Sequence, residues 1–300
     1  MVGATTLHKE QAGTVDLMGG VLEAMRRMLV ARGVRSQVTD VDGQPVHFYA
    51  LEGQGKGPPV VLVHGLGGSA GGFSRVFFEL TKRFSRVLAV DLPGHGFSAE
   101  YCKGQVCVRG QFDVLRDWCQ QVVGEPAFVV GNSLGGAMSI QLAAEHPELV
   151  RALALVAPAG ARLAEARLVE LLSSFDVKTV AQSRELTRKL FHKPPPALML
   201  FAGALRGLYT TPTVRALAEE ARATQAFLAP EVLRELTQPV LLLWGESDRL
   251  LPSESRDYFR AHLPPHAEIH SVKGFGHVPQ VERPSELVSH LVRFADAQGL

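Results

Sequence analysis

A serine between two glycines is the strongest chemical signal in this 300-residue chain. The segment reads Gly131-Asn132-Ser133-Leu134-Gly135, and it joins an apolar run at 127–130 to a helix-like run at 135–146. A serine at a sharp strand-to-helix turn adopts strained backbone angles, and the flanking glycines leave room for neighbouring chain segments. We therefore expect Ser133 to be a nucleophile whose hydroxyl projects above a sheet.

A serine hydroxyl is a weak nucleophile at neutral pH, so a base must lie within hydrogen-bond reach of it. Among the eleven histidines, His277 lies in a glycine-rich turn after the last predicted strand, and such a turn can direct a side chain inward. The base in turn needs a carboxylate that fixes its tautomer and stabilises its positive charge. Asp248 follows an apolar run and is the candidate, with Glu246 as the nearest alternative and a loop cap as its other interpretation.

Two backbone N–H groups are expected to stabilise the oxyanion that forms when the serine attacks a carbonyl. One belongs to Leu134, at the N-terminal end of a helix, where the helix dipole favours negative charge. The other belongs to Leu66, in the glycine-rich loop after the first long apolar run. His64 and Gly65 begin that loop and are expected to support it. The serine turn itself is expected to be supported by Gly131, Asn132 and Gly135.

Five motifs in this order resemble those of the α/β-hydrolase fold, and in particular of serine esterases and lipases with a helical cap. They are His64-Gly65, the segment 91–98, the turn around Ser133, the segment 245–252 and Gly276-His277. Together they span residues 59 to about 284. The resemblance implies hydrolysis of a small-molecule carboxylic ester through an acyl-enzyme by Ser133, His277 and Asp248, and the mechanism requires neither a cofactor nor a metal.

Other enzymes of this topology offer alternative reactions. Dehalogenases and epoxide hydrolases have aspartate at the turn, where this chain has Ser133. Hydrolases of carbon–carbon bonds in ring-fission products are a closer alternative because they also use serine. They commonly carry tryptophan directly after the catalytic histidine, whereas this chain has Val278. Lipase, thioesterase and aminopeptidase activities stay open, as does a ligand-binding protein without catalysis.

His64, Asp91 and His95 have an alternative interpretation as metal ligands. The proline and glycines around Asp91 and His95 place those two residues on a turn rather than on one helix face. We therefore expect no metal site, and we expect all three side chains to support the loops at the strand ends. A direct contact of the His64 ring with substrate stays open.

Strand and helix patterns alternate along most of the chain, which predicts an α/β fold with a mostly parallel sheet flanked by helices. The dipeptide Asp42-Gly43 predicts an opening antiparallel hairpin. Near-continuous apolar runs predict strands buried on both faces at 59–63, 87–90, 127–130, 152–156 and 240–244, with a last strand at 268–272. Helices are expected at 72–82, 108–123, 135–146 and 284–294.

The strand pattern stops between residues 159 and 238, where we expect a helical cap with helices ending at Phe191 and Phe227. The core is then formed by residues 35–158 and 239–300. The cap carries apolar residues that could enclose a short to medium acyl or an aromatic group above the serine, although each could instead pack cap helices together. They are Phe175, Leu198, Met199, Leu200, Phe201, Leu205, Leu208, Tyr209 and Phe227.

Residues 1–34 are expected to form an N-terminal helical extension. Its apolar face contains Val21, Met25, Met28 and Leu29. Packing on the body of the same chain is the main interpretation of this face, and a membrane-surface contact or a dimer contact is the alternative.

Composition excludes several classes of protein. Apolar residues make up 46% of the chain, charged residues 20%, and the net charge is +1, so we expect a globular protein rather than a nucleic-acid partner. No stretch approaches the ~20 apolar residues that cross a bilayer, and no secretory signal pattern is present, so we expect a cytoplasmic location. The three cysteines, Cys102, Cys107 and Cys119, are expected to be reduced, with a pair between the first two as the alternative.

Overall fold

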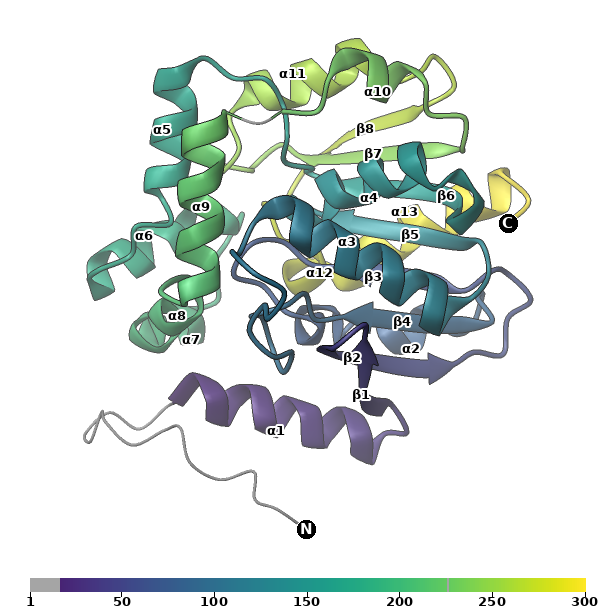
Figure 1. Cartoon of the computed structure of the whole chain (residues 1–300), viewed down its shortest axis with the longest axis horizontal. Helices are drawn as coiled ribbons and strands as arrows, with labels where there is room; N and C mark the ends of the chain where they lie inside the picture. The colour runs from purple at the N-terminus through teal and green to yellow at the C-terminus, as the bar shows by residue number, and fades with distance from the viewer. Residues whose placement is uncertain (1–16, 226) are drawn as a thin grey trace.

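The computed structural model describes residues 17–225 and 227–300, and this part of the chain contains an eight-stranded sheet with helices on both faces (Figure 1). In chain order the strands are β1 (Arg35–Val41), β2 (Gln44–Glu52), β3 (Val60–Val63), β4 (Arg86–Val90), β5 (Ala127–Asn132), β6 (Val150–Val156), β7 (Val240–Gly245) and β8 (Glu268–Val272). Across the sheet they run β1-β2-β4-β3-β5-β6-β7-β8. Only the pairs β1–β2 and β2–β4 of this described sheet are antiparallel, so the predicted mostly parallel sheet is confirmed.

The opening hairpin forms as predicted. Asp42 and Gly43 join β1 to β2 with φ angles of 49° and 81°, which is the conformation that a tight two-residue hairpin turn requires. The carboxylate of Asp40 accepts a hydrogen bond from the Gly43 N–H at 2.7 Å and stabilises the turn.

The central strands are buried on both faces because helices cover each side of the sheet. In β3, Val61 and Val63 contact one apolar cluster, whereas Val60 and Leu62 contact another. The first cluster contains side chains of α3 (Val108–Trp118), α4 (Leu134–Glu145) and α11 (Ser253–His262). The second contains side chains of α1 (Leu17–Ala31), α2 (Phe77–Leu80) and α13 (Pro284–Ala297). Short helical segments complete the body: η1 (Ala70–Phe73), η2 (Cys119–Val123), η3 (Pro147–Leu149) and α12 (Pro279–Glu282).

The helix expected at 72–82 is only partly present. The structure has the 3₁₀ turn η1 and the single-turn helix α2 with residues 74–76 between them. The adjacent Gly71 and Gly72 have low helix propensity, and the Ala70 N–H donates to the carboxylate of Asp91 at 2.6 Å, which holds the start of η1 in place. The other predicted helices outside the 159–238 segment are present as α3 with η2, α4 and α13.

The segment between β6 and β7 is helical in its described part. It contains α5 (Glu165–Ser173), α6 (Val180–Leu190), α7 (Pro196–Leu200), α8 (Ala202–Tyr209), α9 (Pro212–Thr224) and α10 (Pro230–Arg234). Thr211 caps α9 by accepting from the Val214 N–H at 3.3 Å, as its position before proline predicts. This helix ends at Thr224 rather than at Phe227, because Gln225 adopts a left-handed φ of 48°. Figure 1 shows α5, α6, α8 and α9 grouped beside the sheet.

The N-terminal helix α1 packs on the same chain. Leu29 is fully buried, and Met25 contacts the apolar cluster beneath the sheet. Val21 and Met28 of the predicted apolar face are 51% and 46% exposed, so only part of that face is covered. The first sixteen residues of the predicted extension lie outside the described part of the chain. No helix among the described residues has the length and apolar character needed to cross a membrane.

Candidate active site

Ser133 lies at the turn between β5 and α4 with φ 55° and ψ −120°. A serine with positive φ is strained and persists only where its surroundings hold it. The surroundings do so through three backbone hydrogen bonds: the Ser133 N–H donates to Val156, and its carbonyl accepts from Ala137 and Ala159 at 2.9 to 3.1 Å. The backbone therefore fixes where the hydroxyl can point.

The glycines around Ser133 are required by close packing. A Cβ atom on Gly131 would lie 2.5 Å from Gly135 O, and one on Gly135 would lie 2.3 Å from Val63 O. On the other side of the serine, a Cβ on Gly65 would lie 2.9 Å from Ser133 Cβ. These contacts bring the loop after β3 against the turn that carries the hydroxyl.

His277 and Asp248 form a buried pair. The His277 Nδ1 atom lies 2.7 Å from Asp248 Oδ2, and the two side chains are 3% and 0% exposed. The other carboxylate oxygen of Asp248 accepts from the N–H groups of Leu250 and Leu251 at 2.9 and 3.0 Å. An ionised carboxylate only accepts, so Nδ1 carries the proton and Nε2 is left as a base. Glu246, the alternative carboxylate, is exposed.

Ser133 and His277 line the same cavity of about 300 Å³. The Asn132 side chain links them, because its Nδ2 donates to the His277 carbonyl at 3.0 Å and its Oδ1 accepts from Gln280 at 3.0 Å. Among the described residues no hydrogen bond joins Ser133 Oγ to His277 Nε2. In enzymes without bound substrate such contacts are often long and shorten in the complex.

The two predicted oxyanion donors have no acceptor among the described residues. The Leu134 N–H is the first of α4, and Leu66 lies in the loop after β3, where it lines the cavity. The Gly68 N–H bonds to Gly65 O at 2.9 Å and closes a turn around Leu66. Unpaired N–H groups at a helix N-terminus or on a cavity wall can stabilise a negative charge that develops on a bound group.

His64 holds the loop through both ring nitrogens. Nδ1 donates to Gly65 O at 2.8 Å, and Nε2 accepts from the Leu92 N–H at 3.1 Å, which defines a neutral ring. Burial lowers the pKa of His64 below its ordinary value, in agreement with that neutral state. The ring borders the cavity, and both of its nitrogens are engaged in these hydrogen bonds.

Asp91 fixes the loops beside the cavity. One carboxylate oxygen accepts from Ala70 and the other from the Phe97 N–H at 3.1 Å, as its predicted supporting role requires. The second oxygen also lies 2.7 Å from His47 Nδ1, whose ring reaches Ser36 Oγ through Nε2 at 2.8 Å. Sequence analysis missed His47, and a polar residue within a strand that is otherwise buried is the signal that could have pointed to it.

The burial of His95 can be tested through the pH dependence of the free energy of unfolding. Burial lowers its pKa to about 3, whereas an exposed histidine has a pKa of about 6.5. Below about pH 6.5 this residue therefore binds a proton in the unfolded chain but not in the folded chain. Each fall of one pH unit then reduces the free energy of unfolding by about 1.4 kcal/mol. Urea unfolding from pH 7.5 to 4.5 should show a shallower decline in His95→Gln than in the parent chain. An equal decline would contradict the assignment, and exposed His266→Gln is the control.

The apolar residues predicted to enclose the substrate divide into two groups. Phe175, Leu198, Leu205, Leu208 and Tyr209 line the cavity, as expected. The expectation is wrong for Leu200, Phe201 and Phe227, which are 73%, 51% and 41% exposed, and Met199 is not part of the cavity wall. Burial raises the pKa of Tyr209 to about 12, so its hydroxyl stays protonated at neutral pH.

The cavity also has a wall that sequence analysis missed. The α1 side chains Met18, Val21, Leu22 and Met25 face the space beside Ser133. The three cysteines are free thiols and lie outside the cavity wall.

Comparisons with known proteins agree with this geometry. A family model described as the alpha/beta hydrolase family matches residues 60–290. The chain is 30% identical to the pimeloyl-[acyl-carrier protein] methyl ester esterase of Nitrosomonas europaea over 254 residues, which are 80% of this chain and 96% of that protein. A solved membrane phospholipase A, a bacterial virulence factor, superposes with a TM-score of 0.78 and 29% identity over 94% of this chain and 92% of its own.

A second solved structure represents a different reaction. The 2-hydroxy-6-oxo-6-phenylhexa-2,4-dienoate hydrolase of Rhodococcus sp. strain RHA1 superposes with a TM-score of 0.75 and 26% identity over 87% of this chain and 98% of its own. The order of the strands, the strained serine turn and the extent of these matches lead to one conclusion: the chain belongs to the alpha/beta hydrolase family.

Proposed function

We propose that the chain is a serine hydrolase that cleaves carboxylic esters through an acyl-enzyme. Ser133 Oγ attacks the carbonyl carbon while its proton passes to His277 Nε2. The N–H groups of Leu66 and Leu134 donate to the oxyanion. His277 then protonates the departing alkoxide, which leaves as an alcohol. A water molecule next gives a proton to His277 and attacks the acyl carbon, and the acid leaves as Ser133 recovers its proton.

The buried pair of His277 and Asp248 is the observation that carries this proposal. With Nδ1 held by a carboxylate at 2.7 Å, the free Nε2 is a base on the wall of the cavity that Ser133 also lines. The unpaired N–H groups of Leu66 and Leu134 support the same chemistry. The esterase and phospholipase relatives named above also support ester hydrolysis.

Hydrolysis of a carbon–carbon bond is the second candidate, supported by the 26% identity to the dienoate hydrolase. The two reactions share a serine, a histidine and an oxyanion site, so the choice depends on the substrate that the cavity accepts. Thioester and lipid ester hydrolysis are variants of the first proposal on the same residues.

We also propose that residues 159–238 act as a cap over the core formed by 35–158 and 239–300. Phe175, Leu205 and Tyr209 of this segment border the cavity, which supports the proposal. The apolar lining is suited to a short or medium acyl group or to an aromatic group.

One assay separates the two candidate reactions. The purified chain is offered p-nitrophenyl esters of increasing length and, separately, a ring-fission dienoate. We expect rapid turnover of the esters, slow turnover of the dienoate, and covalent labelling by a fluorophosphonate that Ser133→Ala abolishes. Fast dienoate turnover with negligible ester turnover would contradict the ester proposal, and absence of labelling would contradict a serine nucleophile.

A further inference from the structure

The helix α1 forms one wall of the cavity that contains Ser133. Met18, Val21, Leu22 and Met25 recur at intervals of three and four residues along one side of the helix and border this space. Met25 also packs over η1, because a Cβ atom on Gly71 would lie 2.5 Å from Met25 Cε. This side of the cavity is therefore built by the N-terminal helix rather than by the segment between β6 and β7.

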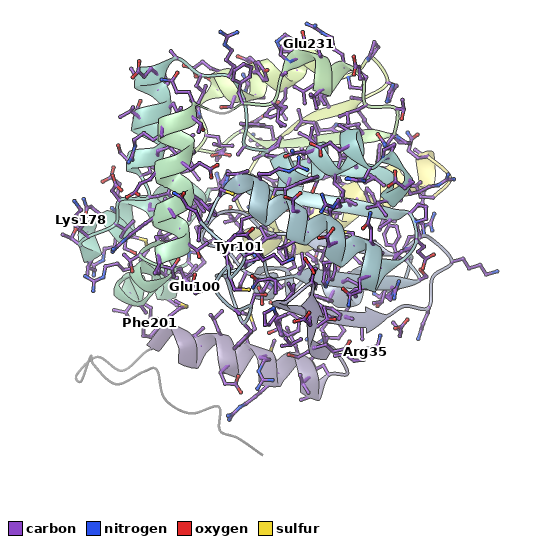
Figure 2. The ribbon with its side chains drawn as sticks, viewed as in Figure 1. Arg35, Glu100, Tyr101, Lys178, Phe201 and Glu231 are labelled. Carbon is purple, nitrogen blue, oxygen red and sulfur yellow. The ribbon has the colours of Figure 1, made fainter. Side chains whose placement is uncertain are left out.

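The helix α8 forms another part of the cavity wall. Leu205, Leu208 and Tyr209 border the cavity, and a Cβ atom on Gly67 would lie 2.7 Å from the Tyr209 ring. The helices α1 and α8 contact each other directly. Figure 2 labels Phe201, the residue directly before α8, which is exposed. Side chains of both helices thus pack close to the segment after β3 that carries the Leu66 N–H.

The side chains of α1 and α8 that line the cavity favour an apolar ligand group. Leu22 and Met25 of α1 face the same space as Leu205 and Leu208 of α8, with no polar atom among their side chains. Of the described residues around the cavity, Arg75 alone carries a permanent charge, and its guanidinium donates to Val281 O at 3.1 Å. An apolar chain buried here gains free energy with each methylene group, whereas a charged group would have no partner between the two helices.

We propose that α1 and α8 form an acyl-chain subsite, and that Leu22 limits the length of the acyl group delivered to Ser133. This inference rests on the proposed ester hydrolysis for its substrate. It assigns α1 a direct part in specificity, in addition to its packing on the body of the chain.

The position of α1 is fixed at its C-terminal end. Leu29 is fully buried beneath the sheet, and Arg32 lies 3.8 Å above the centre of the Phe78 ring. Single substitutions on the cavity side can therefore change the wall while the helix stays anchored.

The test measures kcat/KM for p-nitrophenyl esters from acetate to decanoate. In the parent chain we expect an increase of about fourfold per added methylene group until the cavity is filled. Leu22→Trp fills the space and should lower kcat/KM at least tenfold for decanoate while acetate changes less than twofold. Leu22→Ala should move the optimum to longer esters. The control is Met28→Trp, which places the same side chain on the same helix at a residue that is 46% exposed and outside the cavity wall.

Two results would overturn the subsite: an equal change for acetate and decanoate in both Leu22 variants, or no change for either ester. Binding of sodium decanoate to the Ser133→Ala chain, measured by calorimetry, separates this inference from the proposed reaction. Leu22→Trp should weaken that binding at least tenfold even if the parent chain hydrolyses no ester, in which case only the proposed reaction fails. The subsite would be contradicted if Leu22→Trp left the affinity for decanoate unchanged, or if decanoate did not bind to the Ser133→Ala chain at all.

Discussion

Replacing Ser133 with alanine is expected to lower kcat/KM for a p-nitrophenyl ester by about 10⁴-fold to 10⁶-fold. In the proposed mechanism the substitution removes the atom that forms the acyl-enzyme, whereas the proposed oxyanion donors at Leu66 and Leu134 are backbone groups and stay in place. A residual rate about 10³-fold above that of the uncatalysed hydrolysis in water is therefore expected, because substrate binding and oxyanion stabilisation remain. Steady-state kinetics with active-site titration measure both quantities.

Two controls make the Ser133→Ala result specific. The thermal unfolding midpoint should stay close to that of the parent chain, because alanine has the same backbone restrictions at φ 55° and removes only a hydroxyl. Ser289→Ala removes an exposed serine on α13 and should leave the kinetics unchanged. Activity of the Ser133→Ala chain within tenfold of the parent would show that a different group attacks the substrate.

Replacing Asp248 with asparagine is expected to lower kcat by about 10⁴-fold through the tautomer of His277. The N–H groups of Leu250 and Leu251 both donate to Asp248 Oδ1, so the amide oxygen of asparagine must occupy that position. The amide nitrogen then faces His277 Nδ1 and donates to it. The ring proton moves to Nε2, and the ring can no longer accept the proton of Ser133.

The structure offers a matched control for this substitution. Glu246→Gln makes the same chemical change two residues away on an exposed side chain, and its kcat should stay within twofold of the parent. Nitrogen NMR of the histidine ring reports the tautomer directly, with the proton on Nδ1 in the parent chain and on Nε2 in Asp248→Asn. If Asp248→Asn keeps the parent kcat, or keeps the proton on Nδ1, the proposed role of the carboxylate is wrong.

The strands and the order of the chemical residues were predictable because they depend on local sequence. Apolar runs of four or five residues specify the central strands, which helices cover on both faces. The less buried strand β8 was also predicted with its observed bounds. Glycine and proline mark the turns after those strands, so Ser133, Asp248 and His277 could be assigned to strand ends. The carboxyl ends of parallel strands lie at one edge of a sheet, which explains why distant residues could be expected to meet there.

The partners of individual side chains were decided by the tertiary structure. Spacing shows that α1 has an apolar face, but the packing of Leu29 determines which part of that face turns toward the cavity and leaves Met28 exposed. On the single-turn helix α7, periodicity could not separate Leu198, which lines the cavity, from Leu200, which is exposed. The contact of His47 with Asp91 joins residues 44 positions apart.

The local sequence thus determines the helices and strands and the candidate catalytic residues, through residue types, turn residues and hydrophobic periodicity. Packing between distant segments decides which side chains line the cavity and keeps the His64 ring neutral. It also decides that Asp248, rather than Glu246, pairs with His277. Such contacts arise only when the sheet and its helices bury their apolar faces together, because burial and hydrogen-bond geometry are properties of the folded whole.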